Sequence, residues 1–225
     1  MPVAHFYQSS EQTCGPACLR MLFAALGAAH VEAAVAQKCG LTALGCTVQD
    51  LVLGAQAFGF NAGLLPVRSE PDAIAALSNQ APFVAMIDLA SMWNTLPMFQ
   101  WHFVVPLRVF QGAVVFHDPA DGPDCRAPSR RLPFRLGHSR IPRSERMDPM
   151  SRVRDYLLDN VGHMTYPGNA SFDPPTQRWY VPVFCRSVRG SVVVGDVELD
   201  QAGHIVFAPS KEDMLALLEP TTAIK

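Results

Sequence analysis

The chain has 225 residues, of which 49% are hydrophobic and 17% are charged, and its formal net charge is −2. This apolar fraction suffices for a packed core, so the composition excludes a disordered chain. The small net charge gives no general attraction to nucleic acid or to anionic lipid. No apolar run is long enough to span a membrane, and the N-terminus lacks the basic and apolar regions of a signal peptide. We therefore expect a cytoplasmic protein with no nucleic-acid partner and no transmembrane segment.

The six cysteines fit the same expectation. Without an export signal they are expected to be free thiols rather than three disulfides. Cys39 and Cys46, together with His117 or Cys125, are the residues that first suggest a metal site. Their spacing matches no compact zinc motif, so we expect neither a metal nor another cofactor.

Helices are predicted in the first part of the chain. Gly15-Pro16 is typical of a helix start, because proline is tolerated in a first turn. Apolar residues then recur at helical spacing, and Gly27 ends the run. Thr47 is a good N-cap for a later helix. The predicted helices cover residues 17–26, 31–38 and 48–58.

Short β-rich runs follow these helices. Gln111-Gly112 separates two of the runs and predicts a hairpin turn between them. Pro106 lies inside the first run of this pair and predicts an edge strand or a bulge. Helices followed by an antiparallel sheet favour an α+β fold over a doubly wound one. The predicted strands cover 60–67, 83–87, 103–109 and 113–117, with a short helix at 71–77.

Arginine and proline dominate the region that follows, from residue 126 to residue 177. This composition predicts a solvated linker, or alternatively a loop that contacts an acidic peptide, a nucleotide or a phosphate-rich surface. The tail regains a regular pattern, with Ser210 as the cap of a final helix. The predicted elements are a helix at 151–160, strands at 178–188, 191–199 and 204–208, and a helix at 211–218.

These patterns divide the chain into three predicted parts. Residues 1–140 form the main domain, with helices packed on an antiparallel sheet. Residues 141–177 form a linker or loop with a short helix, and residues 178–225 form a small β-meander plus helix. A meander of this size is small for independent stability, so it is expected to dock on the main domain.

Cys14 is the first candidate for chemistry. It lies at the predicted start of a helix, where the helix dipole and unpaired backbone N–H groups favour a thiolate. A cysteine near a helix start is more often a buried packing residue, since free cysteines are among the most buried residues. For Cys18, one turn further along, packing is the favoured interpretation.

His102 and Asp118 favour a catalytic interpretation of Cys14 over a packing one. His102 begins one strand of the predicted hairpin and Asp118 ends the next, so the two lie near the same end of the ladder. His102 would then activate the thiol and protonate a leaving amine, and Asp118 would orient the ring. Gln8, or Gln12 as a substitute, would join the Cys14 N–H as oxyanion donors. Asp118 would otherwise merely shape the turn before a proline.

At these residues the chain resembles the double-glycine leader peptidases, the papain-like domains found at the N-terminus of bacteriocin-processing exporters. The resemblance covers roughly residues 1–125 to 1–140, a usual domain size. Its pieces are Gln8 six residues before Cys14, the run Cys14-Gly15-Pro16-Ala17-Cys18-Leu19, the block from Gly45 to Phe60, His102-Phe103-Val104-Val105, and Asp118-Pro119-Ala120 sixteen residues after the histidine.

The resemblance implies a papain-like α+β fold and cleavage after a Gly-Gly pair in a leader peptide, through a thioester. By position, Cys14 takes the role of nucleophile, His102 of base, Asp118 of orienting residue and Gln8 of oxyanion donor. No transporter sequence follows, so we expect a stand-alone form. The arginine-rich region and the terminal meander have no counterpart in the resemblance.

Two other functions are open at this point. One is a different acyl-transfer enzyme with the same three groups, such as a transglutaminase-like protein. The other is a catalytically silent, peptidase-like module that binds a peptide without cutting it, with the terminal meander as a docking element. The sequence favours a cysteine peptidase with a peptide or protein substrate, because the four candidate residues occur in the order Gln, Cys, His, Asp.

Overall fold

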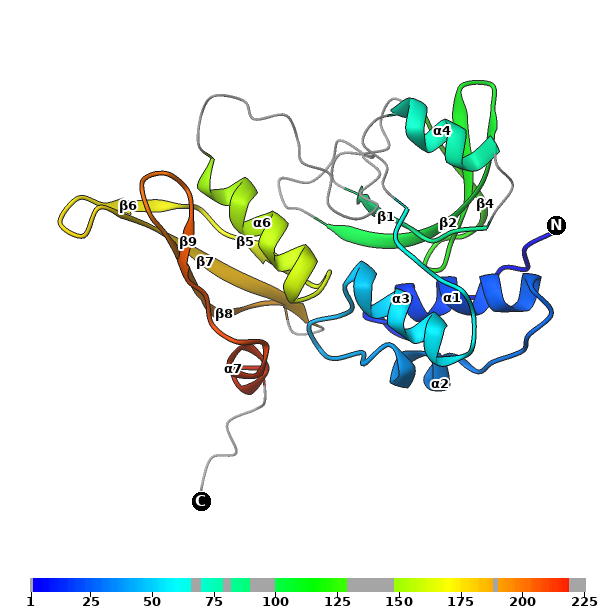
Figure 1. Cartoon of the computed structure of the whole chain (residues 1–225), viewed down its shortest axis with the longest axis horizontal. Helices are drawn as coiled ribbons and strands as arrows, with labels where there is room; N and C mark the ends of the chain where they lie inside the picture. Colours follow the sequence, from blue (N-terminus) through cyan, green and yellow to red (C-terminus); the bar gives the residue numbers. More distant parts are fainter. Residues whose placement is uncertain are drawn as a thin grey trace, which may run out of the picture. The chain divides into compact units, whose positions relative to one another are not determined.

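The structure of the chain is a computed structural model (Figure 1). It describes residues 2–65, 70–78, 82–89, 100–128, 148–187 and 190–218. The chain forms two compact units. Unit 1 comprises residues 1–42 and 46–141, and unit 2 comprises residues 43–45 and 142–225.

The described helices of unit 1 lie close to where the sequence predicts them. Thr47 forms a capping box with Asp50, in which each side chain accepts a hydrogen bond from the other residue's N–H. The predicted role of Thr47 as a helix cap is therefore confirmed. The helices are α1 (Cys14–Ala25), α2 (Glu32–Lys38), α3 (Val48–Ala57) and α4 (Glu70–Ser78).

The strand predicted at 60–67 is wrong for residues 60–65, which have no strand structure, while 66–67 lie outside the described residues. Phe60 instead stacks on Phe23 of α1, with ring centroids 4.5 Å apart. Its N–H donates to the Ala55 carbonyl at the end of α3. Phe60, the aromatic residue that suggests a strand here, covers a helix instead, because packing decides where such residues lie.

The sheet of unit 1 is an antiparallel meander in the order β1-β2-β3-β4. The predicted hairpin turn is confirmed: Gln111 and Gly112 have φ values of 51° and 73°, as a type I′ turn requires. The bulge predicted at Pro106 is also confirmed, since the register of β2 on β3 shifts between Pro106 and Arg108. The strands are β1 (Ala85–Asp88), β2 (Trp101–Phe110), β3 (Ala113–Asp118) and β4 (Gly122–Pro128).

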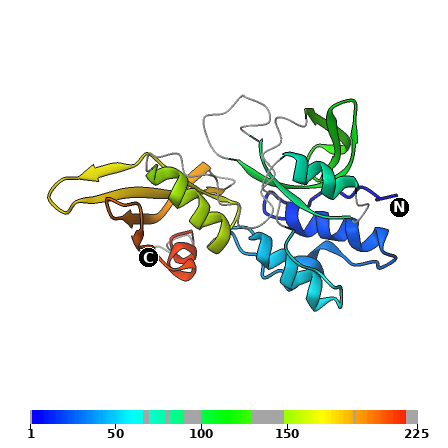
Figure 2. The same cartoon turned by 45° about the horizontal axis from the view of Figure 1, so that its top comes forward.

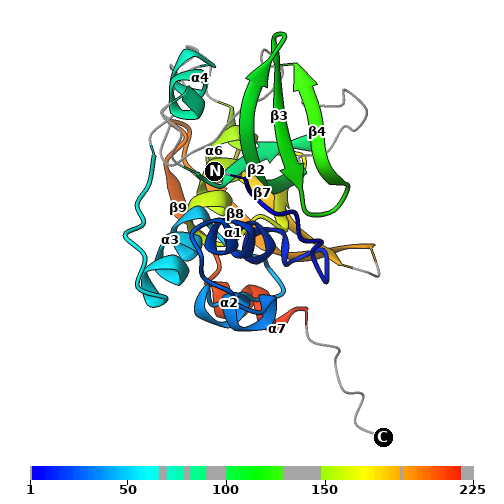
Figure 3. The same ribbon diagram turned by 90° about the vertical axis from the view of Figure 1, so that its right-hand side faces the viewer.

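Strand β2 is covered on both faces. Val104 belongs to a buried cluster with Ala85 and Phe116, against which Leu77 of α4 packs. The next residue towards the N-terminus, Phe103, points to the opposite face, where it lies against Gly15 of α1. Alternate residues of one buried strand thus contact α4 and α1 (Figure 3). This arrangement fixes the start of β2 beside the N-terminus of α1.

The described residues of unit 2 form a five-stranded antiparallel sheet with two helices. The strand order is β5-β7-β8-β9, and β6 pairs with β7. Ser210 forms the predicted cap of the last helix. The elements are α6 (Pro149–Asn160), β5 (Thr165–Pro167), β6 (Ser171–Asp173), β7 (Arg178–Ser187), β8 (Gly190–Leu199), β9 (Ile205–Phe207) and α7 (Lys211–Ala216).

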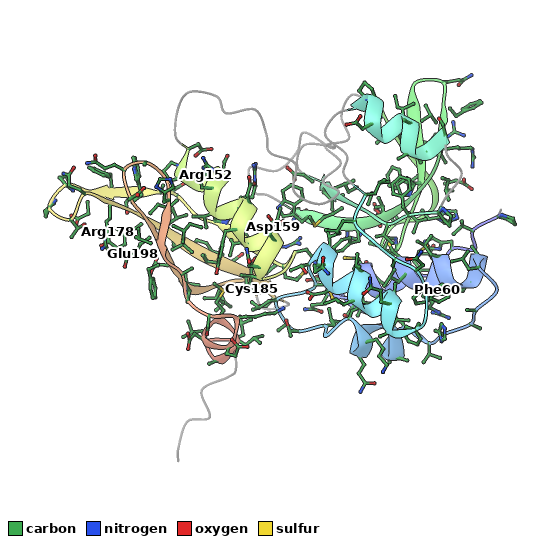
Figure 4. The ribbon with its side chains drawn as sticks, viewed as in Figure 1. Phe60, Arg152, Asp159, Arg178, Cys185 and Glu198 are labelled. Carbon is green, nitrogen blue, oxygen red and sulfur yellow. The ribbon has the colours of Figure 1, made fainter. Side chains whose placement is uncertain are left out.

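Helix α6 lies along the sheet of unit 2 and contributes to its core (Figure 2). Val153 and Leu157 of α6 are fully buried together with Val181 and Val183 of β7. The opposite face of β7 is wetter, and Arg178 at its start forms an ion pair with Glu198 of β8 (Figure 4). Residues 141–177 therefore contain a helix and two strands that belong to the fold of unit 2.

Residues 43–45 belong to unit 2, although the chain on either side of them belongs to unit 1. Leu44 is fully buried in the core of unit 2, and its carbonyl accepts a hydrogen bond from the Met164 N–H. Gly162 approaches so closely that a Cβ atom there would lie 2.2 Å from the Leu44 oxygen. Across the two units, no helix within the described ranges is long and apolar enough to cross a membrane.

Candidate active site

Cys14 is the first residue of α1 and its side chain is completely buried. The N-cap residue, Thr13, does not cap the helix with its side chain. Its hydroxyl instead exchanges hydrogen bonds with the backbone N–H and carbonyl of Ser10. The positive end of the helix dipole therefore faces Cys14 without a competing side-chain oxygen, which favours a negative charge on the sulfur.

Cys18 lies one turn further along α1 and is also fully buried. Burial, followed by repulsion from the negative charge of Cys14, raises the pKa of the Cys18 thiol well above its ordinary value. Cys18 therefore remains a neutral thiol in the core. The two cysteines therefore have different environments, because Cys14 lies at the helix N-terminus and Cys18 lies one turn inside the helix.

His102 and Asp118 form a buried pair in unit 1. His102 Nε2 lies 2.8 Å from Asp118 Oδ1, and the two residues are 7% and 2% exposed. The register explains this contact, because Val105 of β2 pairs with His117 of β3, which brings the start of one strand to the end of the other. The predicted proximity of His102 and Asp118 is therefore present in the structure.

The Asp118 carboxylate is held in its ionised form. The N–H groups of Ala120 and Asp121 both donate to Oδ1, at 2.8 and 3.3 Å. Burial by itself raises the pKa of Asp118, but the hydrogen bond and charge of His102, with these two N–H groups, outweigh it and lower the pKa. The carboxylate is thus a fixed negative partner for the ring of His102.

Burial and neighbouring groups shift the pKa of His102 in opposite directions. Burial lowers its pKa, but the negative charge of Cys14, hydrogen bonds to Asp118 and Cys14, and the charge of Asp118 together raise the pKa to about 10. Since Nε2 bonds Asp118, the other ring nitrogen is the one available to Cys14. The pKa of His102 is thus influenced by Cys14 as well as by its hydrogen-bond partner Asp118.

Gln8 lies in the segment that leads to α1. Its N–H donates to the Pro119 carbonyl, at 2.9 Å, next to Asp118. Its side-chain Oε1 is buried and has no hydrogen-bond partner among the residues that the structure describes. Gln12, the alternative candidate, lies in the turn that precedes the helix. The backbone of Gln8 is therefore held in place by a hydrogen bond, whereas the oxygen of its side-chain amide has no partner among the described residues.

An apolar cavity of about 360 Å³ lies in unit 1, and its wall includes residues of α1 in the range from Leu19 to Phe23. Phe103, which follows His102, and Leu51 are part of its wall, and both contact Gly15, which follows Cys14. Sequence reasoning did not find this cavity, because part of its wall is the segment that was predicted as a strand. Its size and lining suit apolar side chains of a ligand.

Three more polar residues lie around the site, and the sequence did not single them out for a role there. Glu32 is 9% exposed and binds Ser9. His5 contacts the backbone oxygen of Asp118, and His117 contacts the backbone oxygen of Val3. No local pattern could identify them, since each is a lone polar residue whose partners are distant in the chain. Within the described ranges, no group of three or more histidine, cysteine or acidic side chains could hold a metal ion.

A buried cysteine at a helix N-terminus, linked to a histidine that a carboxylate orients, is typical of cysteine peptidases of the papain class. Comparison with known families agrees with this class. The profile of the Peptidase C39 family matches residues 3–126, and the chain belongs to this family. The resemblance predicted from the sequence and the α+β, papain-like fold class are thereby confirmed.

Two solved structures are similar to part of the chain. The peptidase domain of Streptococcus ComA, a bi-functional ABC transporter involved in a quorum-sensing pathway, is 17% identical, with a TM-score of 0.42 over 58% of this chain and 84% of that chain. A putative C39-like peptidase from Bacillus anthracis is 15% identical, with a TM-score of 0.46 over 56% of this chain and 84% of that chain. Comparison with curated protein sequences found no match.

Proposed function

We propose that this protein hydrolyses peptide bonds through a thioester intermediate on Cys14, with His102 as general base and acid. The observation that carries the proposal is the buried contact of His102 with Asp118, in a site where Cys14 also influences the pKa of His102. Asp118 orients the ring and stabilises the imidazolium. Gln8 and the Cys14 N–H stabilise the oxyanion. Membership of a peptidase family supports this chemistry.

In the first half of the reaction the Cys14 thiolate attacks the scissile carbonyl carbon. The carbonyl oxygen becomes an oxyanion, to which the amide of Gln8 donates a hydrogen bond. The imidazolium of His102 then gives its proton to the leaving amine, and the carbon–nitrogen bond breaks. The raised pKa of His102, about 10, keeps that proton on the ring at neutral pH until the amine accepts it.

In the second half a water molecule replaces the amine. The now neutral His102 takes a proton from this water as it attacks the thioester carbon. A second oxyanion forms at the same position and collapses, releasing the carboxylic acid and the thiolate. Because Cys14 is completely buried, a substrate reaches the sulfur only when neighbouring groups move aside, so access to Cys14 is part of the mechanism.

The substrate class we propose is a peptide cleaved after Gly-Gly or other small residues, as in a leader peptide. Glycine fits where backbone atoms must approach a buried sulfur closely. The apolar cavity beside Gly15 and Phe103 supports a peptide that also carries apolar side chains. We further propose a cytoplasmic location, with the peptidase in residues 1–140 and an appended module that includes residues 178–225.

The test uses a synthetic peptide with one internal Gly-Gly pair and the full chain. Mass spectrometry should detect cleavage after the pair and an acyl-enzyme on Cys14 in a rapid acid quench. Cys14→Ala should lower kcat by about 10³-fold or more, as the loss of a nucleophile does elsewhere. Cys125→Ala is the matched control, because this partly exposed thiol also lies in unit 1 and should leave kcat unchanged.

Other outcomes separate the rival functions. Transfer of the acyl group to an added amine, faster than to water, would support a transglutaminase-like enzyme. Tight binding of the peptide without cleavage, equal in the parent and in Cys14→Ala, would support a silent binding module. Full turnover by Cys14→Ala would contradict the proposal outright.

A further inference from the structure

The N-terminal segment is hydrogen-bonded to three consecutive residues at and after the end of β3, namely residues 117–119. Residues 3–8, called here the N-terminal strap, run alongside this strand before the chain enters α1 (Figure 3). Each contact joins one residue of the strap to one residue of the corner that contains Asp118. The contacts are His117 Nε2 with the Val3 oxygen at 2.9 Å, His5 Nε2 with the Asp118 backbone oxygen at 2.8 Å, and the Gln8 N–H with the Pro119 oxygen at 2.9 Å.

The protons on the two histidine rings follow from their partners. The Asp124 N–H donates to His117 Nδ1 at 3.2 Å, so this nitrogen carries no proton. His117 therefore donates from Nε2 to Val3, and His5, whose Nε2 also faces a carbonyl oxygen, donates as well. The two rings meet edge to face, with centroids 5.5 Å apart. Together they fix the strap in one position against β3.

The residue that follows the strap, Ser9, is anchored by Glu32. The N–H and hydroxyl of Ser9 both donate to one carboxylate oxygen of Glu32, which is the first residue of α2 and is buried. Gln8 therefore lies between two anchors, the corner after Asp118 on one side and Glu32 on the other. Its backbone position depends on both, because its own N–H bonds Pro119 and the next residue, Ser9, bonds Glu32.

Loss of the strap would affect Gln8 and Asp118 differently. The Asp118 carboxylate keeps its bonds to His102, Ala120 and Asp121, none of which belongs to the strap. The side-chain amide of Gln8 has no such support, because within the described part of the chain the one hydrogen bond of Gln8 is its backbone contact with Pro119. A strap that comes loose would therefore displace the Gln8 amide and leave the pair of His102 and Asp118 in place.

We propose that His5 is a positioning residue that sets the Gln8 amide for oxyanion stabilisation by clamping the N-terminal strap to the Asp118 carbonyl. This inference rests on the proposed peptidase function. His5 touches no reacting atom. Its effect on the reaction passes through the backbone of the strap to Gln8, over the short span from residue 5 to residue 8.

The test is a double-variant cycle on the full chain with the Gly-Gly peptide as substrate. The variants are His5→Ala, Gln8→Ala and the two combined, with His5→Gln as a conservative change whose side-chain amide can still donate. His204→Ala is the control, because this exposed histidine forms its own ion pair in unit 2. The second readout is the rate of Cys14 alkylation by iodoacetamide, a reaction that forms no oxyanion.

His5→Ala should lower kcat about tenfold or more with little change in KM, since complete loss of an oxyanion donor costs about 10²–10³-fold. The same change should have no further effect in the Gln8→Ala background, should be partly reversed in His5→Gln, and should leave the alkylation rate unchanged. If the losses simply multiply, or if alkylation slows in parallel, His5 acts on the general fold and the inference is wrong. A parent protein that does not cleave the peptide would instead refute the proposed function.

Discussion

At the scale of single residues, the environment of each group determines its chemistry. Cys14 and Cys18 are the same amino acid one helical turn apart, yet burial and the charge of Cys14 raise the pKa of Cys18 well above normal. His102 is buried, which should make it neutral, but Cys14 and Asp118 keep it charged. Two negative partners thus outweigh the cost of burying one imidazolium.

The pH dependence of the reaction follows from His102. The imidazolium gives the proton to the leaving amine, so kcat/KM should fall at alkaline pH as His102 loses its proton, with a limb near the pKa of about 10 rather than the ordinary 6.5. Asp118→Asn removes a charge that raises this pKa, so the limb should move to lower pH. A pH–rate profile of both proteins measures this shift, and an alkaline limb near 6.5 in the parent would contradict it.

At the scale of elements, sequence patterns predicted regular helices and hairpins well and missed what packing decides. Local signals such as the capping residue Thr47 and the Gln111-Gly112 turn act over a few residues and need no tertiary context. The segment 60–65 has the composition of a strand but covers helices instead. The short strands β5 and β6 form only because β7 is beside them, so their three residues carry no pattern of their own.

In the candidate site, too, local sequence signals identify some residues and only tertiary packing identifies others. Cys14, His102 and Asp118 could be selected from the sequence because a helix start and a hairpin place them, and chemistry links those residue types. His5 and Glu32 could not, since their contacts join parts of the chain that only the folded structure brings together. The sequence predicts reacting groups more readily than the groups that position them.

A pair of glycines tests the packing of unit 2. Gly162 has a φ of +154°, and a Cβ atom there would lie 2.2 Å from the Leu44 oxygen, whereas Gly190 has a φ of +103° and nothing within 4 Å. Gly190→Ala should cost only backbone strain, about 1–2 kcal/mol. Gly162→Ala adds a clash with backbone and should cost about 3 kcal/mol or more. Urea denaturation followed by circular dichroism compares the two, and equal losses of stability would contradict the described approach of residue 162 to Leu44.

At the scale of the whole molecule, the chain combines a family domain with a second compact unit. The family match ends at residue 126, and unit 2 begins, apart from residues 43–45, at residue 142. Those three residues carry the fully buried Leu44 into the core of unit 2 from the stretch between α2 and α3. Sequence patterns could not show this, because a single apolar residue in a turn does not reveal which core it joins.

The measurement that tests the central claim most directly is the rate of Cys14 alkylation by iodoacetamide between pH 5 and pH 9, with peptide mapping, in the full chain and in His102→Ala. Ordinary thiols are protonated over the lower half of this range, so only a thiolate paired with an imidazolium reacts there. We predict selective labelling of Cys14 below pH 7 in the parent and its loss in His102→Ala. Labelling of Cys14 no faster than of Cys125, with the same pH dependence in both proteins, would contradict the account.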